Sequence, residues 1–231
     1  ASKAGLASTD SGTITVTAVP PVVTGTVYTQ ADRKLSITFD KVINVATFTA
    51  ANLANLSIQD GTTTVTLSGA TIITVANSTL MEATLAVAED NALAAMPDKL
   101  ILKLVVGASC GIKDLSANEL ATNTDYATST YAVTYTAAAA TPITGMLKDS
   151  KSDLVIDNAT INLYDSAGNL RGTATSDAKG AFTLNANVPS GDYTLSVAKA
   201  PFFKNKTQAV AITAGTAVDA GSLLIDPFGI V

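Results

Sequence analysis

Short runs in which apolar residues alternate with polar ones recur along most of this sequence. In an extended backbone every second side chain points to the same face, so such a run can bury one face and leave the other in water. Many of these positions are Val, Ile or Thr, whose branched Cβ atoms favour extended backbone over helix. The runs therefore predict β-strands. The clearest are residues 13–17, 34–39, 62–67, 159–164 and 192–197.

Turn-forming sequences lie between the runs. Asp, Asn, Ser, Pro and Gly favour tight turns because they tolerate left-handed backbone or bond to it through short side chains. They gather at residues 60–61, 166–169, 177–180 and 189–192. Short strands about ten residues apart are typical of β-sandwiches. We therefore predict an all-β chain, with a helix at residues 89–96, ended by Pro97, and short helical turns within 47–53.

A change of composition after residue 136 predicts two tandem sandwiches. The run at 131–136 gives way to an Ala-rich stretch that ends in Pro142, and a new run begins at Ile143. Small residues followed by Pro form a short, fairly stiff joint. Because the prolines at positions 20 and 21 cannot lie inside a central ladder, the run before them predicts a separate N-terminal strand. The expected parts are an N-terminal extension at 1–23, a sandwich at 24–137, a linker at 138–142 and a sandwich at 143–231.

Composition excludes several classes of function. The sequence contains no His, which rules out His-dependent catalysis and imidazole metal sites. The net charge of −5 argues against binding of a phosphate backbone. No apolar run approaches the roughly 18–20 residues that a membrane-spanning helix needs. We therefore expect no enzyme, no nucleic-acid partner and no membrane span.

The chain is also poor in charge. Charged residues make up 14% of it, whereas soluble domains usually carry about 25%. A surface rich in Thr and Ala suits a protein that packs against copies of itself. The alternative is a secreted domain whose polar surface consists of Thr, Ser and Asn.

Two features could carry chemistry. Cys110 is the single cysteine and follows an apolar run, so we expect a small buried hydrophobe, with an intermolecular disulfide or a reactive thiol as the alternative. Asp149, Asp153 and Asp157 could supply oxygen atoms to calcium. They lack the spacing of a known calcium loop, so we expect a solvated loop and no cofactor, with calcium as the alternative.

The C-terminal half contains a recognisable series of strands and turns. Its landmarks are Gly-Met-Leu-Lys-Asp at 145–149, the runs at 159–165 and 175–184, and Val-Pro-Ser-Gly-Asp-Tyr-Thr-Leu-Ser-Val at 188–197. This series resembles the carboxypeptidase-regulatory-like, transthyretin-like sandwiches, which include the Cna-B stalk modules. The resemblance implies a seven-stranded sandwich without catalysis. The turns at 177–180 and 189–191 should also place Phe182, Leu184 and Tyr193 in the core.

The N-terminal half contains Ile-Thr-Phe-Asp at 37–40, Ala-Asn-Leu at 51–53 and a Lys-Asp-Leu turn within 111–120. This pattern resembles the bacterial Ig-like domains of surface-layer and large adhesive proteins. Ala117 stands where that family usually has Gly before Asn118. The alternative is convergence among sandwiches rich in Thr and Val.

Both ends of the sequence are apolar, although solvated tails are usually polar. An alternating apolar strand can complete the open sheet edge of a neighbouring subunit. We therefore predict an assembly role for six residues, namely Ile14, Val16, Val19, Leu224, Phe228 and Ile230. The alternatives are that the first strand pairs within its own domain, or that both ends continue into a longer chain of modules.

Together these features predict a non-catalytic structural protein that is extracellular or on the cell surface. Its partners would be copies of itself, in a pilus-like filament or surface layer joined by β-strand exchange. The alternative is a binding or spacer module of a secreted adhesin or polysaccharide-active protein. Such a module would contact polysaccharide or cell wall through exposed aromatic residues such as Phe202 or Tyr126.

Overall fold

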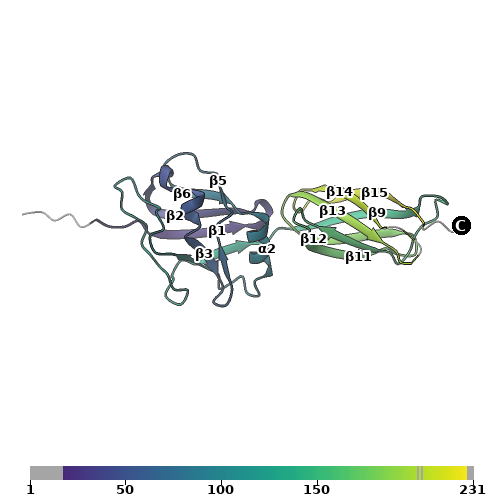
Figure 1. Ribbon diagram of the computed structural model, residues 1–231, viewed down its shortest axis with the longest axis horizontal. Coiled ribbons are helices and arrows are strands. Elements are labelled where there is room, and N and C mark those ends of the chain that lie inside the picture. Colours follow the sequence, from purple (N-terminus) through teal and green to yellow (C-terminus); the bar gives the residue numbers. More distant parts are fainter. Residues whose placement is uncertain (1–17, 202, 204, 228–231) are drawn as a thin grey trace, which may run out of the picture.

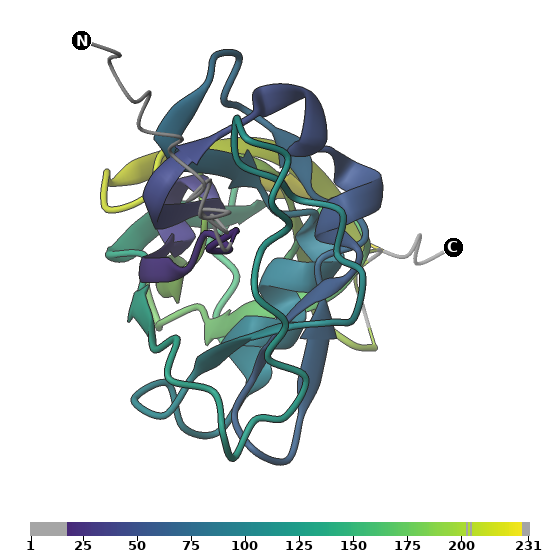
Figure 2. The ribbon, with the colours of Figure 1, turned by 90° about the vertical axis from the view of Figure 1, so that its left-hand side faces the viewer.

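The computed structural model describes residues 18–227 except 202 and 204, and it consists of two β-sandwiches arranged end to end (Figure 1). Viewed along the long axis, the C-terminal sandwich in green and yellow lies behind the N-terminal one (Figure 2). The prediction of an all-β chain of two tandem sandwiches is confirmed. No helix of the described part is long and apolar enough to cross a membrane.

The N-terminal sandwich pairs a five-stranded sheet, ordered β5-β6-β2-β1-β8, with a three-stranded sheet, ordered β4-β3-β7. Strand β1 runs antiparallel to β2 and parallel to β8. The strands are β1 (Val23–Thr29), β2 (Lys34–Ile43), β3 (Leu56–Gln59), β4 (Thr64–Thr66), β5 (Thr71–Ile72), β6 (Ser78–Thr84), β7 (Lys103–Val106) and β8 (Val133–Thr136).

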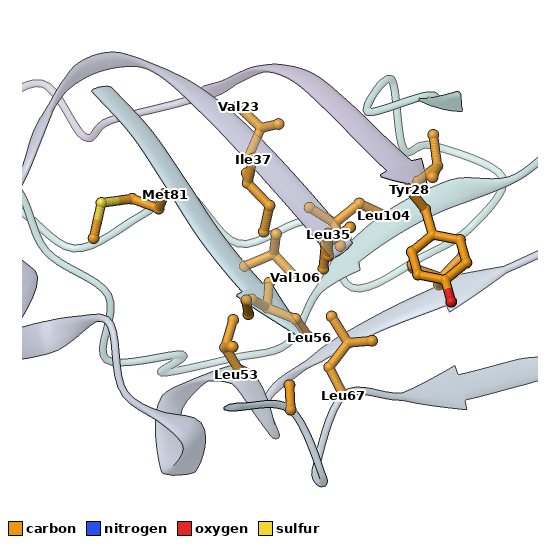
Figure 3. Packing of buried hydrophobic residues seen from close by; sticks show 14 of the residues in the cluster. Val23, Tyr28, Leu35, Ile37, Leu53, Leu56, Leu67, Met81, Leu104 and Val106 are labelled. Carbon is orange, nitrogen blue, oxygen red and sulfur yellow. The ribbon is translucent and has the colours of Figure 1, made fainter. Parts of the chain in front are cut away.

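Alternation along β2 produces the core of this sandwich. Leu35, Ile37 and Phe39 are buried, whereas the residues between them face outward. Figure 3 shows Leu35 and Ile37 packed in one cluster with Leu104 and Val106 of the opposite sheet. The sequence pattern therefore identified the buried face of β2 correctly.

Helix is limited in the described residues, as predicted. The helix expected at 89–96 is α2 (Val87–Ala95), and the expected turns are η2 (Val45–Thr47) and α1 (Ala50–Leu53). A further short turn, η1 (Gln30–Asp32), links β1 to β2. Helix α2 begins two residues earlier than expected, and Glu89 in its first turn accepts the Ala86 N–H at 2.8 Å.

The C-terminal sandwich has seven strands in its described part, as the resemblance implied. They form a sheet ordered β11-β10-β13-β14 and a sheet ordered β12-β9-β15. The side chains of Phe182, Leu184 and Tyr193 are buried in its core. The strands are β9 (Ala140–Asp149), β10 (Thr160–Tyr164), β11 (Leu170–Thr175), β12 (Ala181–Asn187), β13 (Gly191–Ala198), β14 (Lys206–Ile212) and β15 (Val218–Ile225).

The joint between the sandwiches is shorter than the linker expected at 138–142. Strand β9 begins at Ala140, which pairs with Asn187 of β12. Pro142 lies within this strand, but pairing with β15 starts only at Ile143. Proline is tolerated there because, within the described part of the chain, β9 has a single neighbouring strand at that position.

Three turns share one hydrogen-bonding pattern, built on Asp114, Asp165 and Asp177. In each, Oδ1 of the Asp accepts the backbone N–H groups two and four residues later. The residue three positions after the Asp has a positive φ, which favours glycine. These residues are Ala117 (65°), Gly168 (82°) and Gly180 (76°).

Candidate functional site

The backbone between the sandwiches is held from both sides at Ala138. The Ala138 N–H donates to the Gln30 side chain of the N-terminal sandwich at 3.0 Å. Its carbonyl accepts from the Asn187 side chain of the C-terminal sandwich, also at 3.0 Å. A second bridge runs from the Ser190 N–H to the Ala31 carbonyl at 2.9 Å. Because Ala138 is buried, these bonds satisfy backbone groups that would otherwise lack partners.

Charged side chains form another connection beside this backbone. Asp90 on α2 is buried, and its Oδ1 accepts the Tyr28 hydroxyl at 2.7 Å. Its Oδ2 lies 3.7 Å from the guanidinium of Arg171, which belongs to β11 in the other sandwich. Arg171 also lies 3.7 Å from Asp165, in the turn that precedes β11. One cation therefore faces a carboxylate from each sandwich.

Asp165 belongs to the turn network and to the joint at the same time. Its Oδ1 accepts the N–H groups of Ala167 and Asn169 within its own turn. Its Oδ2 accepts the Asn91 side chain of the N-terminal sandwich at 2.7 Å. Asn91 follows Asp90 on α2, so this short helix contributes two adjacent side chains to the joint.

The environments shift the pKa values of these groups in different directions. Burial raises the pKa of Asp90, although the Tyr28 hydrogen bond and the charges of Arg171 and Arg33 oppose this shift. Burial and the neighbouring Asp90 charge raise the pKa of Tyr28, so its hydroxyl keeps its proton and donates a hydrogen bond to Asp90. Burial would also raise the pKa of Asp165, but hydrogen bonds from Asn169 and Asn91 lower it below the usual value.

A cavity of about 260 Å³ lies within this joint. Its wall includes Arg33 and Asp90 from one sandwich and Asp165 and Arg171 from the other. Ligand sites usually measure about 300–1,000 Å³ and are mainly apolar, so this cavity is small and highly charged for such a role. Most of its charged groups face one another. The arrangement is suited to fixing two domains together.

Only part of the predicted assembly set lies in the described residues. Val19 is 60% exposed and Leu224 is 47% exposed. Residues 18–22 form no strand, and the Val19 carbonyl accepts from the Lys41 ammonium group. Ile14, Val16, Phe228 and Ile230 lie outside the described residues. The segment before β1 and the end of β15 lie at opposite ends of the molecule (Figure 1), so the fold does not bring Val19 and Leu224 together.

The three carboxylates considered for calcium are engaged separately. Asp149 accepts the Lys151 N–H at 2.7 Å. Asp153 pairs with Lys148 at 3.1 Å, and Asp157 pairs with Lys199 at 3.6 Å. Within residues 18–227, apart from 202 and 204, the structure contains no group of three or more Cys, Asp or Glu side chains placed to hold a metal.

Two other predicted features have defined surroundings. Cys110 is fully buried and has no disulfide partner in the described part, as expected for a small hydrophobe, and burial raises the pKa of its thiol. Tyr126, which we expected to be exposed, is half-buried, and its hydroxyl donates to the Ile101 carbonyl at 2.9 Å. The Lys103 ammonium lies 4.7 Å from the centre of the Tyr126 ring. Phe202 lies outside the described residues.

Sequence reasoning predicted a joint but missed the side-chain contacts across it, although one signal was available. Arg33 and Arg171 are the only arginines in the sequence. Both line the joint cavity. Arginine suits such a position because its planar, weakly hydrated guanidinium can face several carboxylates at once. The scarcity of arginine elsewhere could have marked these two residues as special.

Comparison with known proteins identifies a family in one part of the chain. Residues 142–222 match the carboxypeptidase regulatory-like domain. This range covers most of the C-terminal sandwich and agrees with the resemblance seen in its sequence. The comparison with curated proteins gives no match.

Three solved structures illustrate distant likenesses to this chain. The 5-hydroxyisourate hydrolase of Klebsiella pneumoniae has 19% identity over 38% of this chain and 92% of its own, with a TM-score of 0.31. The shaft pilin SpaA of Lactobacillus rhamnosus GG has 14% identity over 56% of this chain and 57% of its own, with a TM-score of 0.33. A cohesin–X-dockerin complex of Acetivibrio cellulolyticus has 18% identity over 37% of this chain and 56% of its own, with a TM-score of 0.29. This chain thus spans little more than half of the pilin and of the cohesin–X-dockerin chain.

Proposed function

We propose that this chain is a non-catalytic structural module of an extracellular or cell-surface protein. The observation that carries the proposal is the joint, where buried polar side chains of both sandwiches bind one another. Asn91 with Asp165 and Arg171 with Asp90 join the domains through side chains, and Ala138 joins them through the backbone. A stiff, elongated unit of this kind suits a subunit or spacer that sets distance.

We further propose that the unit repeats through contacts between copies, in a pilus-like filament or a surface layer. The exposed apolar side chains Val19 and Leu224 support contacts near the two ends. Among the described strands, β15 has one ladder partner, β9, and is therefore an edge strand that could accept a strand from another copy. In this proposal the donor is the alternating segment that contains Ile14 and Val16.

The relationship of the N-terminal sandwich to bacterial Ig-like domains is part of this proposal. Two features of the described structure support it. Phe39 and Leu53, which belong to the resembling motifs, are both buried in the core. The Asn118 side chain donates to Asp114 at 2.9 Å, which gives the Lys-Asp-Leu turn a structural reason for its sequence.

Electron microscopy of the purified chain tests assembly directly. We expect ordered filaments or sheets from the full chain and single particles from a variant that lacks residues 1–19. Leu224→Lys should weaken assembly, because it places a charge on the proposed contact. Leu170→Lys is the matched control, since Leu170 is 55% exposed but lies on the other sheet of the same sandwich. Single particles from the full chain and from every variant would contradict the assembly proposal.

The alternative, a binding module, predicts a different result in the same preparation. Such a chain would stay monomeric and bind polysaccharide through an aromatic ring, for which the half-buried Tyr126 is the candidate among the described residues. A glycan array probed with the full chain and with Tyr126→Ala distinguishes the two roles. Specific glycan binding by a monomer, lost on substitution, would favour the binding module.

A further inference from the structure

Each sandwich joins its first strand to its last strand by parallel pairing. In the N-terminal sandwich, β1 pairs with β8 through four residue pairs, from Thr26 with Val133 to Thr29 with Thr136. In the C-terminal sandwich, β9 pairs with β15 through six residue pairs, from Ile143 with Val218 to Asp149 with Ile225. The chain therefore enters and leaves each sandwich through two strands that are hydrogen-bonded to each other.

The direction of these strands decides how they respond to tension. Strand β1 begins at the outer end of the N-terminal sandwich, and β8 ends at the joint (Figure 1). Strand β9 begins at the joint, and β15 ends at the far end (Figure 1). When the chain ends are pulled apart, the paired strands of each sandwich must slide past each other lengthwise. All hydrogen bonds of a ladder then carry the load together, whereas strands pulled from the same end separate one bond at a time.

The joint lies on the same line of force. Tension passes from β8 to β9 through residues 137–139, where Ala138 is bonded to both sandwiches. The contacts of Arg171 with Asp90 and of Asn91 with Asp165 run between the domains beside this backbone. They oppose separation of the sandwiches before either one unfolds.

We propose that this chain bears tensile load, with the β1–β8 and β9–β15 ladders acting as mechanical clamps in series. The inference deepens the proposed structural role, because tension along the long axis is what a stalk or filament subunit carries. It is nevertheless a property of the single chain and does not require assembly.

Single-molecule force measurements on the full chain test the clamps. With one handle at each terminus, we expect two unfolding events, one for each sandwich. In a second geometry the C-terminal handle is replaced by a handle on Thr216→Cys, so that the force is applied at the start of β15. This end of β15 lies beside the start of β9. Thr216 is exposed and precedes β15, whereas Cys110 is buried, so the new thiol is the accessible one.

This change of geometry leaves the sequence almost intact and includes its own control. We expect the unfolding force of the C-terminal sandwich to fall several-fold, because its ladder now separates bond by bond, while the force for the N-terminal sandwich stays unchanged. A handle on Thr130→Cys, an exposed residue just before β8, should produce the same fall for the N-terminal sandwich. Unfolding curves of both variants, measured in bulk solution, check that the substitutions preserve the fold.

Equal unfolding forces in the terminal and internal geometries would overturn the inference. The result of the force measurement is independent of the result of the electron microscopy that tests assembly. A chain that resists tension but remains single in the microscope keeps the clamps and loses the proposed filament or layer. A chain that polymerises but unfolds at the same force in every geometry loses the clamps and keeps the assembly.

Discussion

Arg171, on strand β11 of the C-terminal sandwich, lies 3.7 Å from Asp90, on helix α2 of the N-terminal sandwich. Both side chains are largely buried, with exposed fractions of 11% and 2%. Removing one partner of a buried ion pair leaves an uncompensated charge in a medium that solvates it poorly. The stability of the two-domain unit therefore depends on this contact across the joint.

Replacing Arg171 by Met should destabilise the chain by about 3 kcal/mol, because Asp90 and Asp165 would lose their shared cation. Unfolding in denaturant, followed by circular dichroism, measures the change. Lys34→Met is the control, since the pair of Lys34 with Glu82 is partly exposed and such pairs contribute at most about 1 kcal/mol. Equal losses of unfolding free energy for the two variants would show that the Arg171–Asp90 pair contributes no more than an exposed pair.

Replacing Tyr28 by Phe should cost about 1.5–3 kcal/mol, because Asp90 would lose a hydrogen bond to its charged oxygen. The ring and its packing would remain. Tyr135→Phe is a matched control, since its ring centre lies 5.5 Å from that of Tyr28 and its hydroxyl makes no hydrogen bond to another described residue. Thermal unfolding of both variants compares them. A larger loss for Tyr135→Phe would contradict this role of the Tyr28 hydroxyl.

Replacing Ala117 by Gly should stabilise the chain by about 1 kcal/mol, because a left-handed backbone strains a residue that has a Cβ. Ala117 has a φ of 65° in a turn whose two counterparts place Gly at the same position. The reverse change, Gly168→Ala, should destabilise by a similar amount, since a Cβ there meets no atom within 4 Å and only backbone strain applies. Differential scanning calorimetry measures the change of melting temperature for both variants. A lower melting temperature for Ala117→Gly would refute the argument.

Acid should weaken the fold partly through Asp114. The hydrogen bond from the Asn118 side chain holds the pKa of Asp114 below its usual value. Because the folded state then binds this proton less readily than the unfolded state, stability is lost as pH falls below about 3.9, the usual Asp value, towards the folded pKa. Asp114→Asn should therefore show a shallower fall of melting temperature with acid than the unaltered chain. Parallel curves for the two proteins would count against this effect.

The titration of Asp90 should change stability with pH in the opposite direction. Burial raises its pKa, so the folded state binds this proton more readily than the unfolded state does. Its contribution to stability is therefore fully present below the usual Asp pKa and is lost as pH rises through the raised value. The two effects therefore lie in different pH ranges, with that of Asp114 below the usual Asp value and that of Asp90 above it, and Asp114→Asn should change only the loss of stability in acid.

Local features of the fold could be predicted from sequence because their causes lie within a few residues. Alternation along residues 34–39 placed Leu35, Ile37 and Phe39 on one face, and that face is buried. The turn at Asp177 follows from a short side chain that bonds the next backbone amides, with a glycine where φ is positive. Burial of Cys110 followed from the apolar residues before it.

The side-chain contacts across the joint could not be predicted in the same way. Arg171 and Asp90 are 81 positions apart, and neither belongs to a periodic pattern or a motif that points to the other. The same holds for the choice of β8 as the parallel neighbour of β1, since alternation identifies a strand but not its partner.

The sequence by itself therefore determined the all-β class, the two-domain division, the buried faces and the turns, because backbone preference and side-chain alternation act locally. Only the tertiary structure decided which strands are neighbours, how the two sandwiches meet, and that both arginines lie at their joint. Those outcomes depend on packing between residues far apart in the chain, where the energy of each contact exists only once the whole fold has formed.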